Sequence, residues 1–227
     1  MNMAMKTSSR PVPLDGEPLG RGARKQLTRE RLLDAALTLM SRGHSFPSLS
    51  LRELTREAGV VPTAFYRHFR DMDELGLALV EECGLTLRRL LREARKGGVP
   101  THDIIRHSVA IYLQYVRAHP RQFRAATSER SGGSPAMRQA IRTEVGHFMR
   151  EMAQDLRQLG FRPDLPSETL EMICSLVVNT MLNAASDILD LPPEQPQLAR
   201  ELEANFVGQL RLIFLGAEQW RAEPGTP

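Results

Sequence analysis

Residues 63–68 carry the side-chain types that contact DNA, spaced so that they share one face of a helix. With two phenylalanines four residues apart turned inward, the outward set is Thr63, Ala64, Arg67 and His68, with Tyr66 at its edge. The methyl groups of the first two can touch a thymine methyl, and the arginine can bind guanine O6 and N7 through two hydrogen bonds. The tyrosine and the histidine can donate to phosphates, which fixes register without reading sequence. This face predicts a DNA contact; the alternative is an ordinary surface helix.

Two short helices joined by a tight turn are predicted to position this face. Ser50, followed three residues later by Glu53, forms a capping-box pattern that opens the first helix. Gly59 lets the turn reach positive φ, with a small residue before it and an apolar residue after it to join the helices. Pro62 fits the first turn of the second helix, which is expected to run to about Phe69. This is the spacing of a helix-turn-helix, whose second helix enters the major groove of DNA.

Basic residues concentrate around this motif, although the chain is close to neutral overall. The 227 residues carry a formal net charge of +3, but residues 21–70 contain ten Arg and Lys against four Asp and Glu. Residues 71–227 carry 18 basic and 21 acidic groups. A basic segment on a slightly acidic chain indicates a polyanion partner for that segment; a solvated helix face is the alternative. We expect a DNA-binding domain at residues 23–72.

The composition and periodicity predict an all-α protein of about nine helices. Aromatic residues make up 5%, Leu, Ala, Arg and Glu are abundant, and Val and Thr hardly alternate with polar residues. Residues 1–22, with several Pro and Gly, predict a disordered arm. Helices are then expected over about 23–42, 50–58, 62–69, 73–96, 101–118, 120–130, 135–159, 167–191 and 197–220. Residues 73–227 are expected to form a second, larger helical domain.

Five strings near the N-terminus resemble the TetR family of bacterial repressors. They are Arg24-Lys25, Ser50-Leu51-Arg52-Glu53-Leu54, Ala58-Gly59-Val60, Phe65-Tyr66-Arg67-His68-Phe69 and Asp73-Glu74-Leu75. The resemblance implies a ligand-binding and dimerisation domain after the helix-turn-helix, and DNA contacts from Arg24, Lys25 and Arg52 beside the recognition helix. Two positions depart from the family pattern. Val61 stands where Ser or Thr often caps the recognition helix, and Met72 where a lysine often contacts phosphate, so that contact is not expected.

Two further strings resemble the branch of this family that controls fatty-acid synthesis. They are Thr63 to Leu77, and Phe123-Arg124 followed by Glu129-Arg130-Ser131-Gly132. The resemblance implies control of synthesis or desaturation genes by a long-chain acyl thioester, either acyl-CoA or an acyl carrier protein. A sensor of acyl chains needs a long apolar cavity with a polar mouth. The expected effector contacts are Phe123, Val177 and Met181, with Arg124 and Arg130 as phosphate partners; the alternatives are plain core residues and solvated arginines.

Two apolar helices near the C-terminus predict a homodimer. Residues 167–191 are apolar nearly all round, and the last helix has an apolar stripe too wide for one neighbour. We expect a four-helix interface between two copies, formed by Val178, Leu182, Leu202, Phe206, Leu210 and Ile213. A two-fold dimer places paired recognition helices about 34–36 Å apart, which suits a pseudo-palindromic operator on double-stranded DNA.

Other function classes fit the sequence less well. Glu144 and His147 form a single Glu-x-x-His, whereas a di-iron bundle needs two. Cys83 and Cys174 lie among apolar residues and are expected to be unreactive thiols, so we predict no catalytic residue, metal site or cofactor. The longest uncharged run, 172–186, is shorter than the ~20 residues of a membrane span, and without an apolar signal-peptide core a cytoplasmic location is expected. The alternatives are a repressor of an efflux or catabolic operon that responds to another hydrophobic ligand, and a catalytic helical bundle.

Overall fold

Nine α-helices and one 3₁₀ helix make up the computed structural model, which describes residues 20–96, 98, 100–192 and 194–221. In chain order they are α1 (Arg21–Ser41), η1 (Phe46–Ser48), α2 (Leu51–Glu57), α3 (Pro62–Phe65), α4 (Met72–Arg95), α5 (His102–Ala118), α6 (Pro120–Arg130), α7 (Pro135–Gln158), α8 (Ser167–Leu189) and α9 (Pro196–Gln219). The described residues contain no strand, and the prediction of an all-α fold is confirmed.

The local signals of the helix-turn-helix form the contacts predicted for them. The Ser50 hydroxyl accepts a hydrogen bond from the Glu53 amide at 3.2 Å, and the Glu53 carboxylate accepts one from the Ser50 amide at 3.3 Å. Gly59 has a φ of +65°, a conformation that glycine adopts without strain because it has no Cβ atom. Asp71 caps α4 by accepting a hydrogen bond from the Glu74 amide at 2.8 Å. These contacts fix where α2 and α4 begin.

Two helix boundaries near the N-terminus differ from the prediction by two residues or more. α1 begins at Arg21, so the last two residues of the expected arm are helical; residues 1–19 lie outside the described part of the chain. α3 ends at Phe65 and not near Phe69, because the Arg67 and His68 amides donate to carbonyls three residues earlier, at 3.3 and 2.9 Å. Such tight turns end short helices. Residues 66–68 are therefore a turn at the end of the recognition helix.

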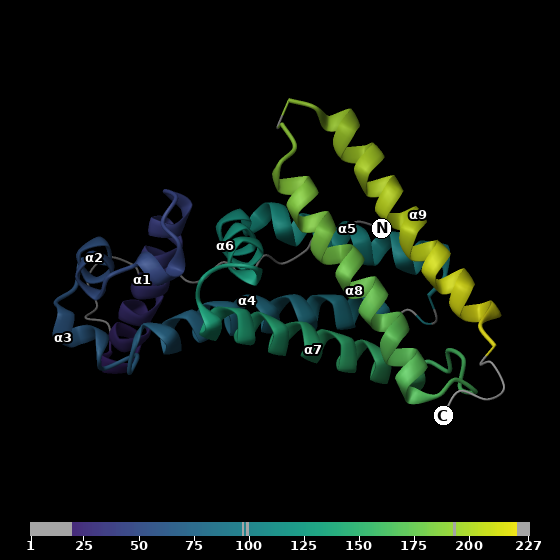
Figure 1. The fold of residues 1–227 in the computed structure, drawn as a ribbon, viewed down its shortest axis with the longest axis horizontal. Coiled ribbons are helices and arrows are strands. Elements are labelled where there is room, and N and C mark those ends of the chain that lie inside the picture. The colour runs from purple at the N-terminus through teal and green to yellow at the C-terminus, as the bar shows by residue number, and fades with distance from the viewer. Residues whose placement is uncertain (1–19, 97, 99, 193, 222–227) are drawn as a thin grey trace.

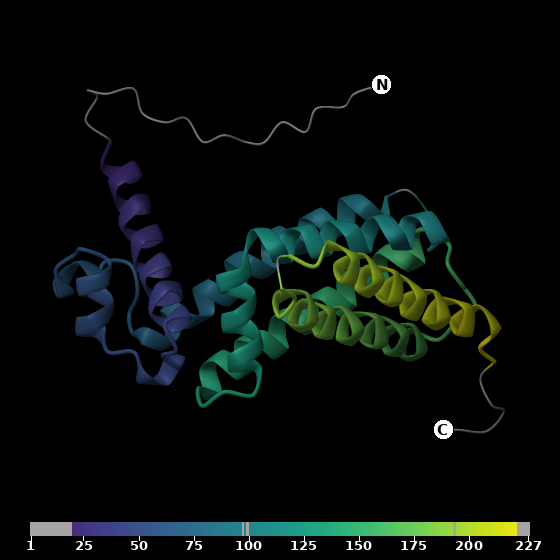
Figure 2. The same ribbon diagram turned by 90° about the horizontal axis from the view of Figure 1, so that it is seen from above.

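Two hydrophobic cores meet at one junction. The first belongs to the head, which we define as residues 20–71, and packs around Leu32, Leu54 and Phe65; it also takes in Ala125 of α6 and Met137 of α7. The second lies inside the bundle formed by α4–α9. Figures 1 and 2 show α4 running from the head into the bundle, with α6 between α1 and the other bundle helices. The head therefore contacts the bundle mainly through α6 and α4.

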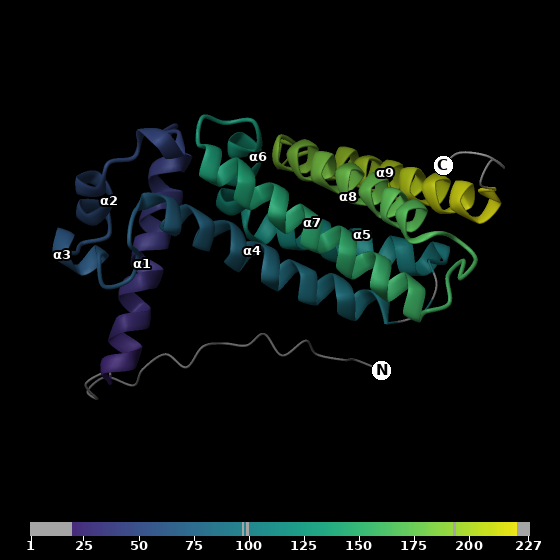
Figure 3. The same ribbon diagram turned by 60° about the horizontal axis from the view of Figure 1, so that its bottom comes forward.

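The bundle is built on α4 and α7, which run side by side in the same direction (Figures 1 and 3). α5 returns antiparallel along α4, and α8 and α9 pack on α5 and on each other. By length and composition α8 could cross a bilayer, with a mean hydropathy of 1.4 over 18 residues. However, Leu170, Ile173 and Val177 of α8 are buried in the bundle core, which is the environment of a core helix.

Candidate nucleic-acid interface and effector cavity

The face predicted to contact DNA lies at the end of the molecule farthest from α9 (Figures 1 and 3). Thr63 and Arg67 are exposed, Ala64 is half-buried, and the Tyr66 side chain is 62% exposed. Phe65 points inward as predicted and is buried in the head core. Among the described residues the Arg67 side chain has no hydrogen-bond or ion-pair partner. It is therefore available to a base or a phosphate.

Positive charge from α1 and α2 adds to this face. Arg24 and Lys25 of α1 and Arg52 of α2 are all exposed. Lys25 and Arg29 lie close enough to the recognition helix to act on the pKa of His68. The head thus offers several cations to a polyanion, as its local charge predicts.

His68 is less exposed than the sequence predicted. The residue is half-buried, and its Nδ1 atom is buried with no hydrogen-bond partner among the described residues. Burial and the positive charges of Lys25, Arg29 and Arg67 lower the pKa of His68 from its usual value. The ring is therefore neutral at neutral pH, and its buried Nδ1 atom is not accessible to a phosphate. The expected outward position of His68 is corrected in this respect.

The two departures from the family pattern have visible consequences. Val61 supplies no side-chain cap to α3, whose first turn instead begins with Pro62. Met72 is half-buried and packs against the head core. Its side chain carries no positive charge that could bind a phosphate, and it packs the start of α4 against the head core instead.

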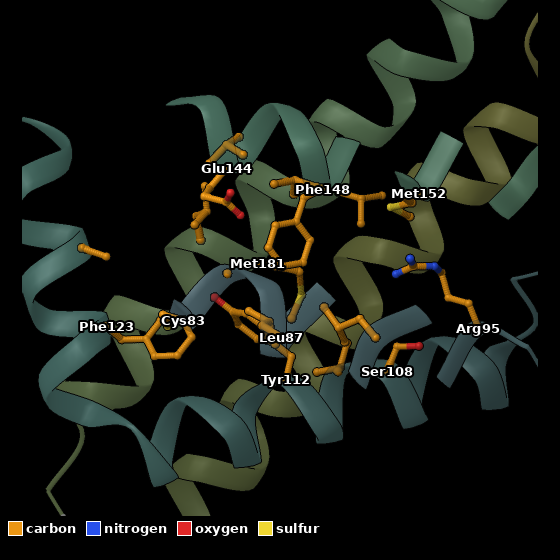
Figure 4. Close-up of a pocket in the computed structure, with 18 of the residues that line it drawn as sticks. Cys83, Leu87, Arg95, Ser108, Tyr112, Phe123, Glu144, Phe148, Met152 and Met181 are labelled. Atoms are coloured by element: carbon orange, nitrogen blue, oxygen red, sulfur yellow. The ribbon is translucent and has the colours of Figure 1, made fainter. Parts of the chain in front are cut away.

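An apolar cavity of about 180 Å³ lies inside the bundle (Figure 4). Its lining follows α4 from Leu79 to Arg95, which are about 24 Å apart because a helix rises about 1.5 Å per residue. Phe123, Val177 and Met181, which the sequence named as effector contacts, are part of the lining. The lining therefore extends along most of α4.

The two arginines expected at the mouth of the cavity do not line it. Both are exposed on α6 and hold α8 instead. Arg124 donates from Nη2 to the Leu189 carbonyl at 2.6 Å, and Arg130 donates from Nη2 to Asn179 Oδ1 at 3.0 Å. The prediction that these arginines line the effector site is therefore wrong. Both lie on the surface of α6, because their contacts to α8 direct the side chains away from the cavity.

The residues expected at a dimer interface face mostly inward. Val178, Leu182 and Leu210 line the cavity. Phe206 and Leu210 are only 3% and 4% exposed. Leu202 and Ile213 are half-buried against the bundle core. The assignment of Phe206 and Leu210 to the interface is therefore wrong, because both are buried within their own chain, whereas the assignment of the four half-buried residues stays a prediction. Four large apolar side chains are exposed in the first half of α8 and the second half of α9: Met172, Leu176, Leu212 and Leu215.

A row of ion pairs joins α4 to α7 beside the cavity. The pairs are Arg88–Glu144, Arg88–Glu151, Arg92–Glu151, Arg92–Asp155 and Arg95–Asp155. Glu144 also bonds to His147, the other half of its Glu-x-x-His, at 3.0 Å. Because these carboxylates are held by arginines, they are structural partners and not available general bases. Among the described residues no three His, Cys, Asp or Glu side chains are grouped to hold a metal ion.

Neither cysteine has the surroundings of a reactive thiol. Burial raises the pKa of Cys83 to about 11 and that of Cys174 to about 12. Both thiols are therefore protonated at neutral pH, and a thiol reacts as a nucleophile through its thiolate.

One junction residue was missed by the sequence analysis. Glu129 of α6 is 1% exposed, and its Oε1 atom accepts a hydrogen bond from the Phe46 amide of the head at 2.9 Å. Beside it, Gly76 allows close packing, since a Cβ atom there would lie 2.6 Å from Met137 Sδ and 2.7 Å from Phe46 Cζ. Phe46 and Glu129 are 83 residues apart in the sequence, so no local sequence pattern predicts the hydrogen bond between them.

Two family models and many solved structures match this architecture. Residues 32–79 match the model for "Bacterial regulatory proteins, tetR family", and residues 101–210 match "Tetracyclin repressor-like, C-terminal domain". The fatty acid degradation regulator FadR from Bacillus halodurans matches with a TM-score of 0.64 at 13% identity, over 90% of this chain and 100% of that one. FadR from Bacillus subtilis, in complex with stearoyl-CoA, matches with a TM-score of 0.61 at 13% identity, over 82% and 98%. A transcriptional regulator from Rhodococcus sp. Rha1 has a TM-score of 0.62 and 22% identity, over 85% and 96%.

Proposed function

The chain belongs to the TetR family of bacterial regulatory proteins, and we propose that it represses fatty-acid synthesis or desaturation genes under the control of a long-chain acyl thioester. The head binds operator DNA through Arg67, Tyr66 and their neighbours, as in a helix-turn-helix. The cavity in the bundle takes the acyl chain. A regulator of this kind acts where the chromosome is, in the cytoplasm.

The length of the cavity is the observation that carries the choice of effector. Its lining spans about 24 Å along α4, whereas the acyl chains of one bilayer leaflet span about 15 Å. Its volume of about 180 Å³ is below the ~300–1,000 Å³ of pockets for drug-sized ligands. The cavity must therefore enlarge to take a long acyl chain, and it is the extended apolar lining along α4 that favours a chain over a compact ligand. The lining residues Met137, Met152 and Met181 are flexible and can move aside for it.

The fold is compatible with such an effector. FadR from Bacillus subtilis, which shares this architecture, was solved with stearoyl-CoA. At 13% identity the likeness concerns the fold, so the assignment of the ligand rests on the cavity and on the quoted sequence strings. A ligand in the cavity would shift the tilt of α4, which runs from the head into the bundle. This shift would change the spacing of the two heads in a dimer.

The proposal is tested by a gel-shift assay on the DNA upstream of the protein's own gene, titrated with palmitoyl-CoA, oleoyl-CoA and free CoA. We expect an acyl-CoA to change operator affinity in either direction and free CoA to leave it unchanged. Indifference to every acyl chain would overturn the fatty-acid assignment and leave a DNA-binding regulator. A response to compact apolar compounds alone would favour a repressor of an efflux or catabolic operon.

The homodimer is proposed to form through the exposed apolar side chains of α8 and α9. Met172, Leu176, Leu212 and Leu215 are each more than two-fifths exposed, and Leu212 reaches 71%. They lie in the first half of α8 and the second half of α9, and these halves are neighbours because the two helices pack antiparallel. A second copy related by a two-fold axis would bury the same patch on both chains.

Leu212→Glu should therefore raise the dimer dissociation constant at least about tenfold, because the two-fold axis places a charge in the apolar interface from each chain. Sedimentation equilibrium measures the effect. Leu85→Glu is the matched control: Leu85 is 58% exposed on α4, away from α8 and α9, and its substitution should leave the dimer intact. Equal dimerisation of the Leu212→Glu variant and the unmodified protein would contradict this interface.

A further inference from the structure

Tyr112 of α5 lines the cavity and has a buried hydroxyl group. The residue is 3% exposed, lines the cavity, and has no hydrogen-bond partner for its Oη atom among the described residues. Figure 4 shows its ring beside Cys83 and Leu87, and the Phe123 ring packs against it edge to face at 6.0 Å. Packing on both sides therefore holds this hydroxyl in place inside an apolar space.

The neighbouring Tyr115 shows that the bundle can satisfy a tyrosine hydroxyl. Tyr115 Oη donates to the Cys83 carbonyl at 3.4 Å. Tyr112 has no such acceptor in the part of the chain that the structure describes, and a buried donor without a partner is unfavourable. Burial also raises the pKa of Tyr112 from its usual value, so the group stays a neutral O–H donor. The cavity thus contains a fixed donor that lacks an acceptor.

We propose that the Tyr112 hydroxyl donates a hydrogen bond to the carbonyl oxygen of the bound acyl group and thereby fixes the position of the thioester. The inference rests on the proposed function and adds where in the cavity the ligand is held. An acyl chain is hydrocarbon along its length, and its carbonyl oxygen is the one acceptor at its end. Of the buried side-chain polar atoms without a hydrogen-bond partner among the described residues, Tyr112 Oη is the one that belongs to a residue lining the cavity, and a carbonyl oxygen would supply the acceptor it lacks.

The position of Tyr112 also sets the direction of the chain. Its neighbour Cys83 is about 6 Å along α4 from Leu79, at the head end of the lining, and about 18 Å from Arg95, at the far end. The longer part of the lining along α4 lies toward Arg95, so the acyl chain would run in that direction. The CoA moiety would then leave on the head side of Tyr112, beside α6.

The hydrogen bond is tested with palmitoyl-CoA and its thioether analogue S-hexadecyl-CoA, which lacks the carbonyl oxygen, by calorimetric titration of the full chain. The unmodified protein should bind palmitoyl-CoA roughly tenfold more tightly than the thioether, the range of one hydrogen bond. Tyr112→Phe should bind the two equally and, without ligand, unfold at the same or a higher Tm. Tyr112→Phe that keeps the discrimination, or an unmodified protein that shows none, would overturn the inference and leave the proposed function intact. Binding of neither compound would overturn both.

The direction is tested by enlarging one small residue on each side of Tyr112. Ser108 lies one turn earlier on α5, toward the Arg95 end, and Ala126 of α6 lies toward the head; both line the cavity. Ser108→Leu should weaken palmitoyl-CoA at least about tenfold by blocking the chain, and Ala126→Leu, on the side away from the chain, should weaken it less. The opposite order, or equal losses in both variants with Tm unchanged, would overturn the direction.

Discussion

Replacing Arg67 by alanine should lower operator affinity by roughly 30-fold to 10⁴-fold, because one base contact contributes about 1–3 kcal/mol and a two-fold dimer makes it twice. The side chain is exposed at the end of α3 and has no partner among the described residues. Its removal therefore leaves no protein group unpaired. The folded state, measured by circular dichroism and Tm, and the dimer should stay unchanged.

Two other variants show whether Arg67 reads sequence. Tyr66→Phe removes a predicted phosphate donor and should weaken operator and random DNA by the same factor, whereas Arg67→Ala should also reduce the ratio between them. Arg106→Ala removes an exposed arginine from the start of α5, at the far end of the bundle, and should leave DNA affinity unchanged. Fluorescence anisotropy with both DNAs measures all three. Full operator affinity in Arg67→Ala would remove Arg67 from the DNA site.

The head was predictable from the sequence because its structure depends on short-range chemistry. Ser50 and Glu53 are three residues apart, and the positive φ of Gly59 follows from its missing side chain. Phe65 could be assigned to the core from periodicity alone. Each signal needs only its own neighbourhood, so the element boundaries were right to within a few residues.

The bundle was predicted less well, because its function depends on which side of a wholly apolar helix meets which neighbour. Periodicity could not distinguish the core contacts of Phe206 and Leu210 from contacts with a second chain, since both need the same residue types. The hydroxyl of Tyr112 and the carboxyl group of Glu129 depend on partners, or on missing partners, far away in the sequence. Such sites become visible only when the helices are packed together.

Replacing Glu129 by alanine should lower the free energy of unfolding by about 1–3 kcal/mol, the penalty for leaving a buried donor unpaired. Glu129 Oε1 is the acceptor for the Phe46 amide at 2.9 Å, at the point where α6 meets the head. α6 also supplies Phe123 and Ala126 to the cavity wall. The contact therefore connects the wall of the effector cavity to the segment between α1 and α2. In a chain of this size the loss corresponds to several degrees in Tm by calorimetry.

The same variant should weaken communication between effector and DNA, because α4 and α6 both link the bundle to the head and the α6 connection loses its buried hydrogen bond. α4 would then carry more of the shift, so the ratio of operator affinities with and without palmitoyl-CoA should move toward one. Glu129→Gln is the matched control: its amide keeps an acceptor oxygen of the same reach for the Phe46 N–H and should preserve most of the stability and of the ratio. If Glu129→Gln lost as much as Glu129→Ala, the hydrogen bond to Phe46 would not be the reason for the effect. If both variants kept the full ratio, α4 would be the sufficient connection, and the contact between α6 and the head would serve stability alone.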